Sequence, residues 1–551
     1  MKKGLLIICV FVLLSGVVSC HEKQKTVAEE VIVARPEQID VTAEAIIRQS
    51  LADLLRSKQL ADSLQLKNIP VLDSIYGLHA YHTFWSTDGV STGPGDSLFS
   101  LIQNARSYGL FPGDYHDKHI SEVKEMLSDS VRRLDAAKWA LHDLLLTSAF
   151  VNMVKHLKGG RIVPDSVLLR DTSFHSRPLF NLLQQFRTLP STNGFTAALE
   201  PAHTDYAELK KALHHFLQNA SFREFTYVHA FDSAKLRQLV YKRIGEEDSI
   251  DLKEQPLDSA ALAGAIQQYQ KLKKMKPDGR LSSELIKKLN DTDKERFIRV
   301  AITMDRYKSL PSLPAKHVWV NIPSFYLKVR RQDTVVLTSK VAVGKTQTRT
   351  PEIISAITDM ITYPQWTIPA SIIEKEILPG LRRDAGYTQR KGYSIIDASG
   401  NEVDPYLVDW SKYKKGIPYK VVQGSGDANA LGVIKFNFPN KHSVYLHDTN
   451  QRYLFSRKHR ALSHGCVRVE SWRELAAFIL ENDSLSSSRF TPKDSLDRWL
   501  SIKQKKVIPV QDKLPVLIKY FTCEGVEGKL VFYDDIYDED RRIRNRYFAT
   551  K

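Results

Sequence analysis

Residues 463–468 read SHGCVR, and a stretch upstream of them, residues 443–447, reads SVYLH. Cys466 is one of four cysteines in 551 residues, and His447 lies nineteen positions before it. A thiol attacks as its thiolate, and a nearby imidazole can lower a thiol pKa from about 8.5 into the range of roughly 3.5–7.5. The two stretches therefore predict a cysteine nucleophile served by a histidine.

The stretch around His447 is typical of a β-strand. Val444 and Leu446 alternate with Tyr445 and His447, so the two aliphatic side chains are expected to face a core. The imidazole of His447 then points to the opposite face of the strand, with Tyr445 as its neighbour.

The residues around Cys466 decide which histidine serves it. His464 stands two residues from the thiol, too close in an extended chain for easy hydrogen bonding, and this favours His447 as the base. Gly465 allows unusual backbone angles beside the nucleophile, which helps adjacent amides to converge on an oxyanion. A capping box, SWRE, opens a helix predicted over residues 472–480, so we expect the cysteine in a loop between a strand and that helix.

The chain alternates between helical and strand periodicity, which predicts a multidomain α+β protein. Apolar residues at three- and four-residue spacing indicate helices in the first half, and alternating residues from His317 onward indicate strands. The predicted regions are a helical scaffold domain at 44–250, a small helical module at 251–293, a mostly-β domain at 317–497 with a capping insertion at about 351–425, and a C-terminal extension at 498–551 that returns strands to the β domain.

The N-terminus has the pattern of an export signal. Two lysines precede an apolar run over residues 5–14, which is too short to span a bilayer, and the pattern ends in VVSC at Cys20. We expect a lipoprotein signal peptide over 1–20, a lipidated Cys20 and a polar tether over 21–43; an ordinary cleaved signal is the alternative. The protein is thus predicted to be an exported, membrane-anchored lipoprotein on the periplasmic side of a Gram-negative envelope.

The chain is basic, with 79 lysines and arginines against 63 aspartates and glutamates and a formal net charge of +16. In an exported protein this excess suits an anionic envelope polymer or an anionic lipid surface. The charge is spread along the sequence and no RNA- or DNA-binding motif occurs, so we expect no nucleic-acid partner.

Three other uses of Cys466 stay open on the sequence. The cysteine can pair with Cys523, although exported disulfide scaffolds carry many more cysteines. It can join His447, His459 and His464 in a zinc site, a mixed set whose spacing fits no common structural zinc pattern. It can serve a papain-like protease, but there the cysteine precedes the histidine, which reverses the order found here. We expect no metal and no cofactor.

The region from His447 to Arg468 closely resembles the active-site signature of the L,D-transpeptidases, the YkuD-type enzymes of peptidoglycan. The signature consists of the histidine, fifteen intervening residues, SHGC, a hydrophobic residue and the arginine. Residues 366–369, WTIP, look like the large multidomain, YcbB-like branch of that family, and residues 109–115 are similar to its helical scaffold domain. Residues 251–293, with their Pro-Asp-Gly turn, resemble a small peptidoglycan-binding module. The resemblance implies that scaffold and peptidoglycan-binding domains accompany a mostly-β catalytic domain.

Carried over position by position, the resemblance implies a role for each residue of the signature. Cys466 would be the nucleophile, and His447 its proton donor and acceptor, oriented by a backbone carbonyl near Asp448. Arg468 would hold a substrate carboxylate or, equally, form a structural salt bridge. The remaining implied roles are an oxyanion hole from the amides of Gly465 and Cys466, loop support from Ser463 and His464, and substrate binding by Tyr445 and Trp366.

The resemblance also implies acyl transfer through a thioester. Cys466 would attack the tetrapeptide stem of a donor strand, release D-alanine and pass the acyl group to the side-chain amine of diaminopimelate on a neighbouring stem. Water as the acceptor would make the protein an L,D-carboxypeptidase, and loss of activity would leave a wall-binding lipoprotein. The expected partners are peptidoglycan stems, carbapenem-type inhibitors that acylate Cys466, and a membrane reached only through the lipid anchor.

Overall fold

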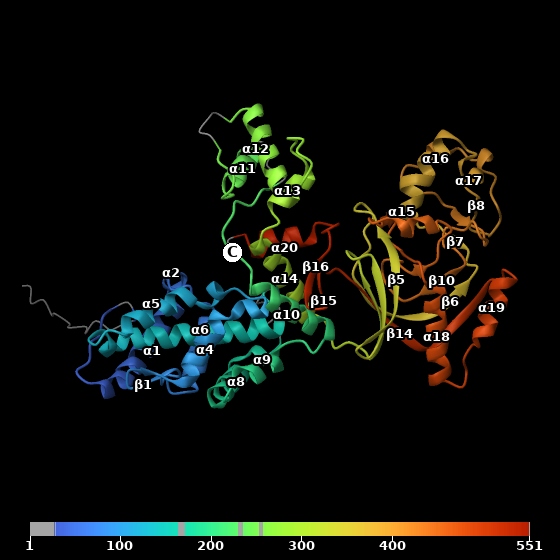
Figure 1. The fold of residues 1–551 in the computed structure, drawn as a ribbon. Helices are drawn as coiled ribbons and strands as arrows, with labels where there is room; N and C mark the ends of the chain where they lie inside the picture. Colours follow the sequence, from blue (N-terminus) through green and yellow to red (C-terminus); the bar gives the residue numbers. More distant parts are fainter. Residues whose placement is uncertain (1–26, 28, 164–170, 230–234, 253–256, 550–551) are drawn as a thin grey trace, which may run out of the picture. The chain divides into compact units, whose positions relative to one another are not determined.

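The computed structural model describes residues 27, 29–163, 171–229, 235–252 and 257–549. The chain divides into two compact units (Figure 1). Unit 1 consists of Met1–Ala105, Phe111–His156 and Asp165–Ala198, and unit 2 consists of Arg106–Leu110, Leu157–Pro164 and Leu199–Lys551. The predicted signal peptide and Cys20 lie outside the described residues. Among the described helices, none combines the length and hydropathy that a bilayer-spanning segment needs.

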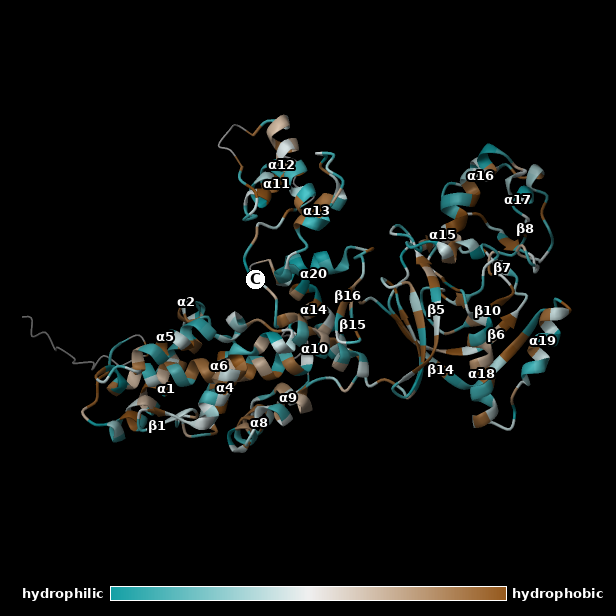
Figure 2. Cartoon of the chain, viewed as in Figure 1, coloured by the Kyte–Doolittle hydropathy of each residue, from teal (hydrophilic) through white to brown (hydrophobic). Residues whose placement is uncertain are grey.

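Unit 1 is helical and is built around helix α6, Ala136–Gly159, which is hydrophobic along much of its length (Figure 2). Its buried Asp143 accepts a hydrogen bond of 2.6 Å from the hydroxyl of Tyr76 and one of 2.8 Å from the backbone N–H of Trp85. Burial raises the pKa of Asp143 to about 6. The other α-helices are α1 Ile39–Arg56, α2 Lys58–Ser63, α3 Ile69–Gly77, α4 Gly93–Gln103, α5 Asp117–Leu127, α8 Ser176–Thr188 and α9 Thr192–Leu199, with a short hairpin of β1 Ser86–Thr87 and β2 Val90–Ser91.

The packed part of unit 1 begins earlier than the sequence analysis predicted. Helix α1 starts at Ile39, whose side chain is fully buried. Before it, the backbone N–H of Val31 donates to Asp135 Oδ1 at 3.0 Å, and the carbonyl of Val31 accepts from the N–H of Ala136 at 2.9 Å. The domain boundary predicted at residue 44 is therefore too late, because the end of the assigned tether already packs on the helical domain.

The small helical module of unit 2 has three helices instead of the predicted two. Helices α12, Ser259–Leu272, and α13, Ser283–Leu289, are the predicted pair, and the side chain of Ser282 caps α13 by accepting from the N–H of Leu285 at 3.1 Å. Helix α11, Leu236–Gly245, buries residues in the same hydrophobic core. The module therefore begins before residue 251.

The β domain is a nine-stranded sheet with the order β12-β5-β13-β11-β10-β6-β14-β3-β4. A further pairing between β4 and β5 closes eight of these strands into a barrel, with β12 added at the side of β5. The strands are β3 Lys316–Asn321, β4 Tyr326–Arg331, β5 Thr334–Gly344, β6 Ile353–Thr362, β10 Ile434–Asn437, β11 Leu446–His447, β12 Ala461–Ser463, β13 Val467–Val469 and β14 Lys506–Lys519.

Strand β14 shows that the barrel needs the C-terminal extension. It pairs with β6 on one side and with β3 on the other, as the sequence analysis expected of strands returning to this domain. The predicted end of the domain at residue 497 is therefore too early. Helix α18, Trp472–Ser486, packs on β14 and runs six residues beyond its predicted end at 480; α19, Lys493–Ser501, follows it.

The rest of the extension packs elsewhere within unit 2. A hairpin of β15, Cys523–Val526, and β16, Lys529–Phe532, lies against helix α10, Thr204–Leu217. Helix α20, Glu539–Tyr547, lies against helix α14, Asp293–Lys308. These contacts join residues more than two hundred positions apart in the sequence.

The insertion over the barrel begins later than predicted. Residues 351–362 include β6, which pairs with β10 and β14 and so belongs to the barrel. The insertion proper, here called the cap, spans residues 366–423 and has its own hydrophobic core. Its elements are strands β7 Trp366–Thr367, β8 Tyr393–Ile396 and β9 Lys420–Gln423, helices α15 Ala370–Ile372, α16 Leu378–Arg383 and α17 Tyr387–Arg390, and a π-helical turn, η6 Ile373–Ile377.

Candidate active site

The site is organised by three adjacent strands of the barrel. In the antiparallel pair of β10 and β11, Lys435 stands opposite His447. In the parallel pair of β11 and β13, His447 stands opposite Arg468. Because directly paired residues share a face of a sheet, the three basic side chains form one row. Leu446 and Val467 take the other face and are fully buried in the barrel core, which confirms the predicted orientation of the His447 strand.

Cys466 lies between β12 and β13, directly before the second of these strands. The sequence analysis predicted that Cys466 lies in a loop between a strand and a helix. Instead, the cysteine lies in a tight link between two strands, and the helix α18 follows after β13. The backbone N–H of Val467 donates to the carbonyl of Tyr445 at 3.1 Å, which sets Cys466 beside the residue preceding β11. The partly exposed thiol lies 3.8 Å from the carbonyl of Ser443.

The charge state of Cys466 is set by opposing influences. Burial raises the pKa of the thiol, whereas Tyr445, Lys435 and Arg468 act to lower it. Tyr445 lowers the thiol pKa through both its backbone and its side chain, and the ammonium of Lys435 lies 4.0 Å from the centre of the tyrosine ring. The positive charges nearest the sulfur therefore come from a lysine and an arginine.

His447 is buried and neutral. Burial, aided by the positive charge of Arg468, lowers the pKa of this imidazole to about 3. Its ring centre lies 5.6 Å from that of Tyr445, so both rings border the thiol side of the strand. Nδ1 has no hydrogen-bond partner within bonding geometry in the described part of the chain. The backbone of Asp448 nevertheless acts to raise the pKa of the ring, as expected of a carbonyl that lies close to the imidazole.

The backbone before the thiol is held by a local network. Gly465 has a φ of +126°, a region that favours glycine. Its N–H donates to Ser463 Oγ at 3.1 Å, and that hydroxyl donates to the carbonyl of Cys466 at 2.6 Å. Thr350 Oγ1 donates to the carbonyl of Gly465 at 2.8 Å. Ser463 thus supports the loop, but it occupies the Gly465 amide that was expected to serve an oxyanion hole, so that amide must exchange partners before it can bind an oxyanion.

His464 connects the nucleophile loop to the cap. Its Nε2 lies 2.5 Å from Oε1 of Glu376 in the π-helical turn of the cap. Single π-turns often mark functional positions in helices. This contact brings the cap directly against the residue two positions before Cys466.

Three further predicted residues occupy distinct places. Arg468 donates to Gln451 Oε1 at 2.9 Å, so its recorded partner is an amide and not a carboxylate, while its Nε is buried without a partner in the described chain. Trp366 of the cap likewise buries an unpartnered Nε1 within the described residues. Asp448 is structural: it accepts from the N–H of Val433 at 3.1 Å and pairs with Arg452 at 2.8 Å.

The structure adds residues that the sequence analysis did not assign to the site. Lys435 and Gln451 contact Tyr445 and Arg468, respectively, and Glu376 contacts His464. In the sequence, Lys435 alternates with the buried residues of β10, which indicates that its side chain lies on the face opposite the core. That this face also carries His447 follows only from the strand register.

The alternative uses of Cys466 are not supported. Cys466 and Cys523 are both free thiols, and the latter is fully buried in the β15 hairpin. His459 packs its ring against Phe325. Among the described residues, no three His, Cys, Asp or Glu side chains converge as metal ligands.

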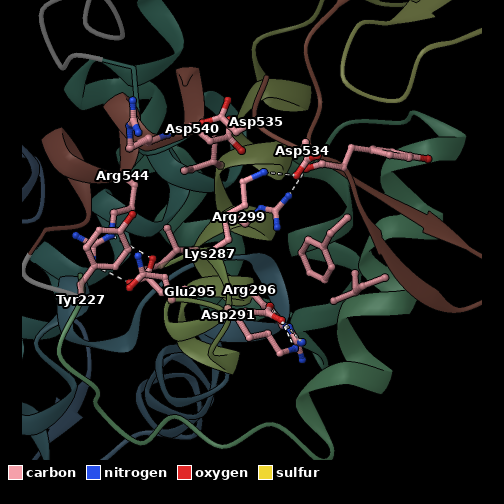
Figure 3. Close-up of a pocket in the computed structure, with 18 of the residues that line it drawn as sticks. Tyr227, Lys287, Asp291, Glu295, Arg296, Arg299, Asp534, Asp535, Asp540 and Arg544 are labelled. Atoms are coloured by element: carbon pink, nitrogen blue, oxygen red, sulfur yellow. Dashed lines mark hydrogen bonds and ion pairs between the residues drawn. The ribbon is translucent and has the colours of Figure 1, made fainter. Parts of the chain in front are cut away.

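A separate cavity of about 990 Å³ lies among α13, α14, α20 and the β15–β16 hairpin (Figure 3). Its walls carry ion pairs between Lys287 and Asp534 at 3.0 Å and between Arg544 and Glu295 at 2.6 Å. None of the residues predicted for the thiol site lines this cavity.

Comparison with known proteins gives two domain matches and one relative. Residues 315–492 match the model of the YkuD family, described as the L,D-transpeptidase catalytic domain, and residues 70–213 match the model described as the Scaffold domain. A protein of Haemophilus influenzae named "Putative L,D-transpeptidase" is 38% identical over 254 residues, which cover 46% of this chain and 50% of the relative. The match therefore spans about half the length of that relative.

Proposed function

Residues 315–492 form an L,D-transpeptidase catalytic domain of the YkuD family, joined to a Scaffold domain at 70–213, and from this premise we propose that the protein cross-links peptidoglycan with Cys466 as nucleophile and His447 as base. The observation that carries the proposal is the register of β11 and β13: His447 pairs with Arg468, so Cys466, just before β13, lies two positions from it along the paired strands. The basic residues Lys435 and Arg468 beside them suit a centre at which negative charge develops on sulfur.

In the first half-reaction, the Cys466 sulfur attacks the carbonyl that joins an L-centre to the terminal D-residue of a tetrapeptide stem. We assign the thiol proton to His447 as the S–C bond forms; its imidazole is uncharged in the free protein because burial lowers its pKa to about 3. The proton then passes to the leaving nitrogen as the C–N bond breaks, which releases D-alanine and leaves a thioester on Cys466.

Two unpartnered donors support binding of the stem at this place. Arg468 Nε and Trp366 Nε1 are buried without acceptors in the described chain, and buried donors in native proteins normally have partners. We assign them to carboxylate and carbonyl oxygens of the bound stem, with Tyr445 lining the same site.

In the second half-reaction, an amine on a neighbouring stem attacks the thioester and regenerates the thiol. Diaminopimelate carries such an amine on its side chain, and its acylation forms the cross-link. The cap favours transfer over hydrolysis because the contact of Glu376 with His464 holds it against the nucleophile loop and excludes water. If water enters instead, the product is that of an L,D-carboxypeptidase.

A peptidoglycan substrate accords with the predicted export of the chain. We propose that the signal over residues 1–20 and lipidation of Cys20 hold the enzyme at the periplasmic side of the envelope, and that the helical module around α12 and α13 binds the wall.

The test is muropeptide analysis of isolated peptidoglycan incubated with the purified protein. Cross-links should form with the native protein, vanish with Cys466→Ala and persist with Cys523→Ala, the matched control at the second free thiol. A carbapenem should add its mass to the peptide containing Cys466. Cross-linking that survives Cys466→Ala would overturn the proposal, and release of D-alanine without cross-links would establish the carboxypeptidase.

A further inference from the structure

We infer that Lys435 is a positioning residue of the reacting centre, whose ammonium group stabilises the negative charge that develops on the Cys466 sulfur. The inference rests on the proposed role of Cys466 as nucleophile. In a preformed cysteine–histidine ion pair, the imidazolium stabilises the thiolate. Here we assign that stabilisation to a lysine of β10.

The position of Lys435 follows from the strand register. Lys435 stands opposite His447 in the β10–β11 pair, while its neighbours Ile434 and Phe436 point into the barrel core and are fully buried. The lysine side chain therefore lies on the face that carries the site. Its ammonium lies 4.0 Å from the centre of the Tyr445 ring, an arrangement in which the ring face attracts the cation.

Tyr445 links the lysine to the sulfur. The backbone N–H of Val467 donates to the carbonyl of Tyr445 at 3.1 Å, so the residue whose ring holds the ammonium stands beside Cys466. Tyr445 also acts to lower the pKa of the thiol. Burial lowers the pKa of Lys435, while the Cys466 sulfur favours the charged lysine and the lysine favours the thiolate.

His447 cannot supply this positive charge. Burial and Arg468 keep the imidazole neutral, with a pKa lowered to about 3. Before it takes the thiol proton, the neutral imidazole of His447 places no positive charge beside the sulfur. Two cations remain, Lys435 and Arg468, and both act to lower the thiol pKa. Arg468 also donates to Gln451 through Nη1, whereas the Lys435 ammonium lies on the ring of Tyr445.

The groups that bear on the sulfur and on the lysine come from every element around them. They are Asp359 of β6, which favours the charged lysine; Tyr445 and His447 at β11; and Arg468 of β13.

The test is the pH dependence of Cys466 alkylation by iodoacetamide, followed by mass spectrometry of the peptide containing Cys466 in the full-length protein. In this reaction the thiolate forms an S–C bond and iodide leaves. Replacing Lys435 by methionine should raise the apparent pKa of alkylation by about one unit, which slows the reaction about tenfold at pH below that pKa. Lys435→Arg should restore most of the rate because it restores the charge.

Lys441→Met is the matched control, because Lys441 is an exposed lysine in the connection between β10 and β11. Its alkylation profile should equal that of the native protein, and thermal unfolding should show that each variant is folded. An unchanged profile in folded Lys435→Met, or no rescue by Lys435→Arg, would overturn the inference. Failure of the proposed function would appear separately, as cross-linking that survives Cys466→Ala.

Discussion

Cys466 and His447 are both neutral in the free protein, because burial disfavours the charged form of each. A preformed ion pair would keep the thiolate populated from about pH 4 upward and give a plateau in reactivity. Here the thiol pKa is raised and the imidazole pKa is about 3, so the thiolate fraction should grow about tenfold per pH unit through neutrality.

Alkylation of Cys466 in the native protein should therefore rise continuously with pH from about 5 to 8, with no inflection near the ordinary histidine pKa of about 6.5. The measurement is the alkylation rate by mass spectrometry, with Cys523, fully buried, as the internal control that stays unmodified in the folded protein. A plateau across this range would show that the ion pair is preformed.

Gly432 is a residue whose lack of a side chain supports the site. It has a φ of +64°, and a Cβ there would lie 2.3 Å from Asp448 Oδ2. Alanine at this position combines left-handed backbone strain with a steric clash, and we expect Gly432→Ala to lower the free energy of unfolding by about 2–4 kcal/mol. Its clash would also displace Asp448, which follows His447 directly.

Gly424→Ala is the control, because a Cβ at Gly424 meets no atom within 4 Å. Denaturant unfolding should leave Gly424→Ala within about 0.5 kcal/mol of the native protein. Equal stabilities for the two alanine variants would contradict the assigned role of Gly432.

At the scale of elements, the cap and the nucleophile loop meet through Glu376 and His464. Both side chains are partly exposed, at 47% and 32%, and such pairs contribute about 0.2–1 kcal/mol. Glu376→Gln should therefore let the cap open more often and raise the ratio of hydrolysed to cross-linked stems by up to about fivefold. Muropeptide analysis measures this ratio.

Glu374→Gln offers the comparison on the same π-helical turn. Glu374 is exposed, and its substitution removes the same charge two residues away from the contact with His464. If both variants shift the ratio alike, the effect comes from the charge of the cap and not from the contact.

The elements differ in how well their sequence predicted them. Helices α12 and α13 could be predicted because their caps and apolar spacing are local signals. The sequence analysis did not assign helix α11 to the module. That assignment depends on the packing of α11 against α12 and α13, which follow it in the chain. The boundary of the cap was misplaced for the same reason: β6 looks like the start of an insertion until its pairing with β10 and β14 is known.

At the scale of the whole molecule, β14 ties the C-terminal extension to the catalytic barrel. Val516 of β14 is fully buried between paired strands, whereas Val507 of the same strand is 52% exposed. Val516→Asp would bury an unpaired carboxylate in the barrel core and should cost more than about 3 kcal/mol of stability, whereas Val507→Asp should cost under about 0.5 kcal/mol.

Denaturant unfolding and the yield of soluble protein measure both variants. If the Val516→Asp variant is as stable as the native protein, then β14 is dispensable for the barrel. The domain would in that case end at residue 497, as the sequence analysis predicted. Loss of activity only in the Val516 variant is the expected result.

The sequence by itself determined the candidates: the thiol, the histidine and the spacing between them are local facts that single out Cys466 and His447, and alternation in the strand predicted which face the histidine takes. The tertiary structure decided which charges surround that pair. Lys435, Glu376 and Gln451 lie far from Cys466 in the sequence or on other elements, and strand register and cap packing bring them to it. The protonation of His447 was decided in the same way, because burial is a property of the folded chain and removes the positive charge that an exposed imidazole can lend to the thiol.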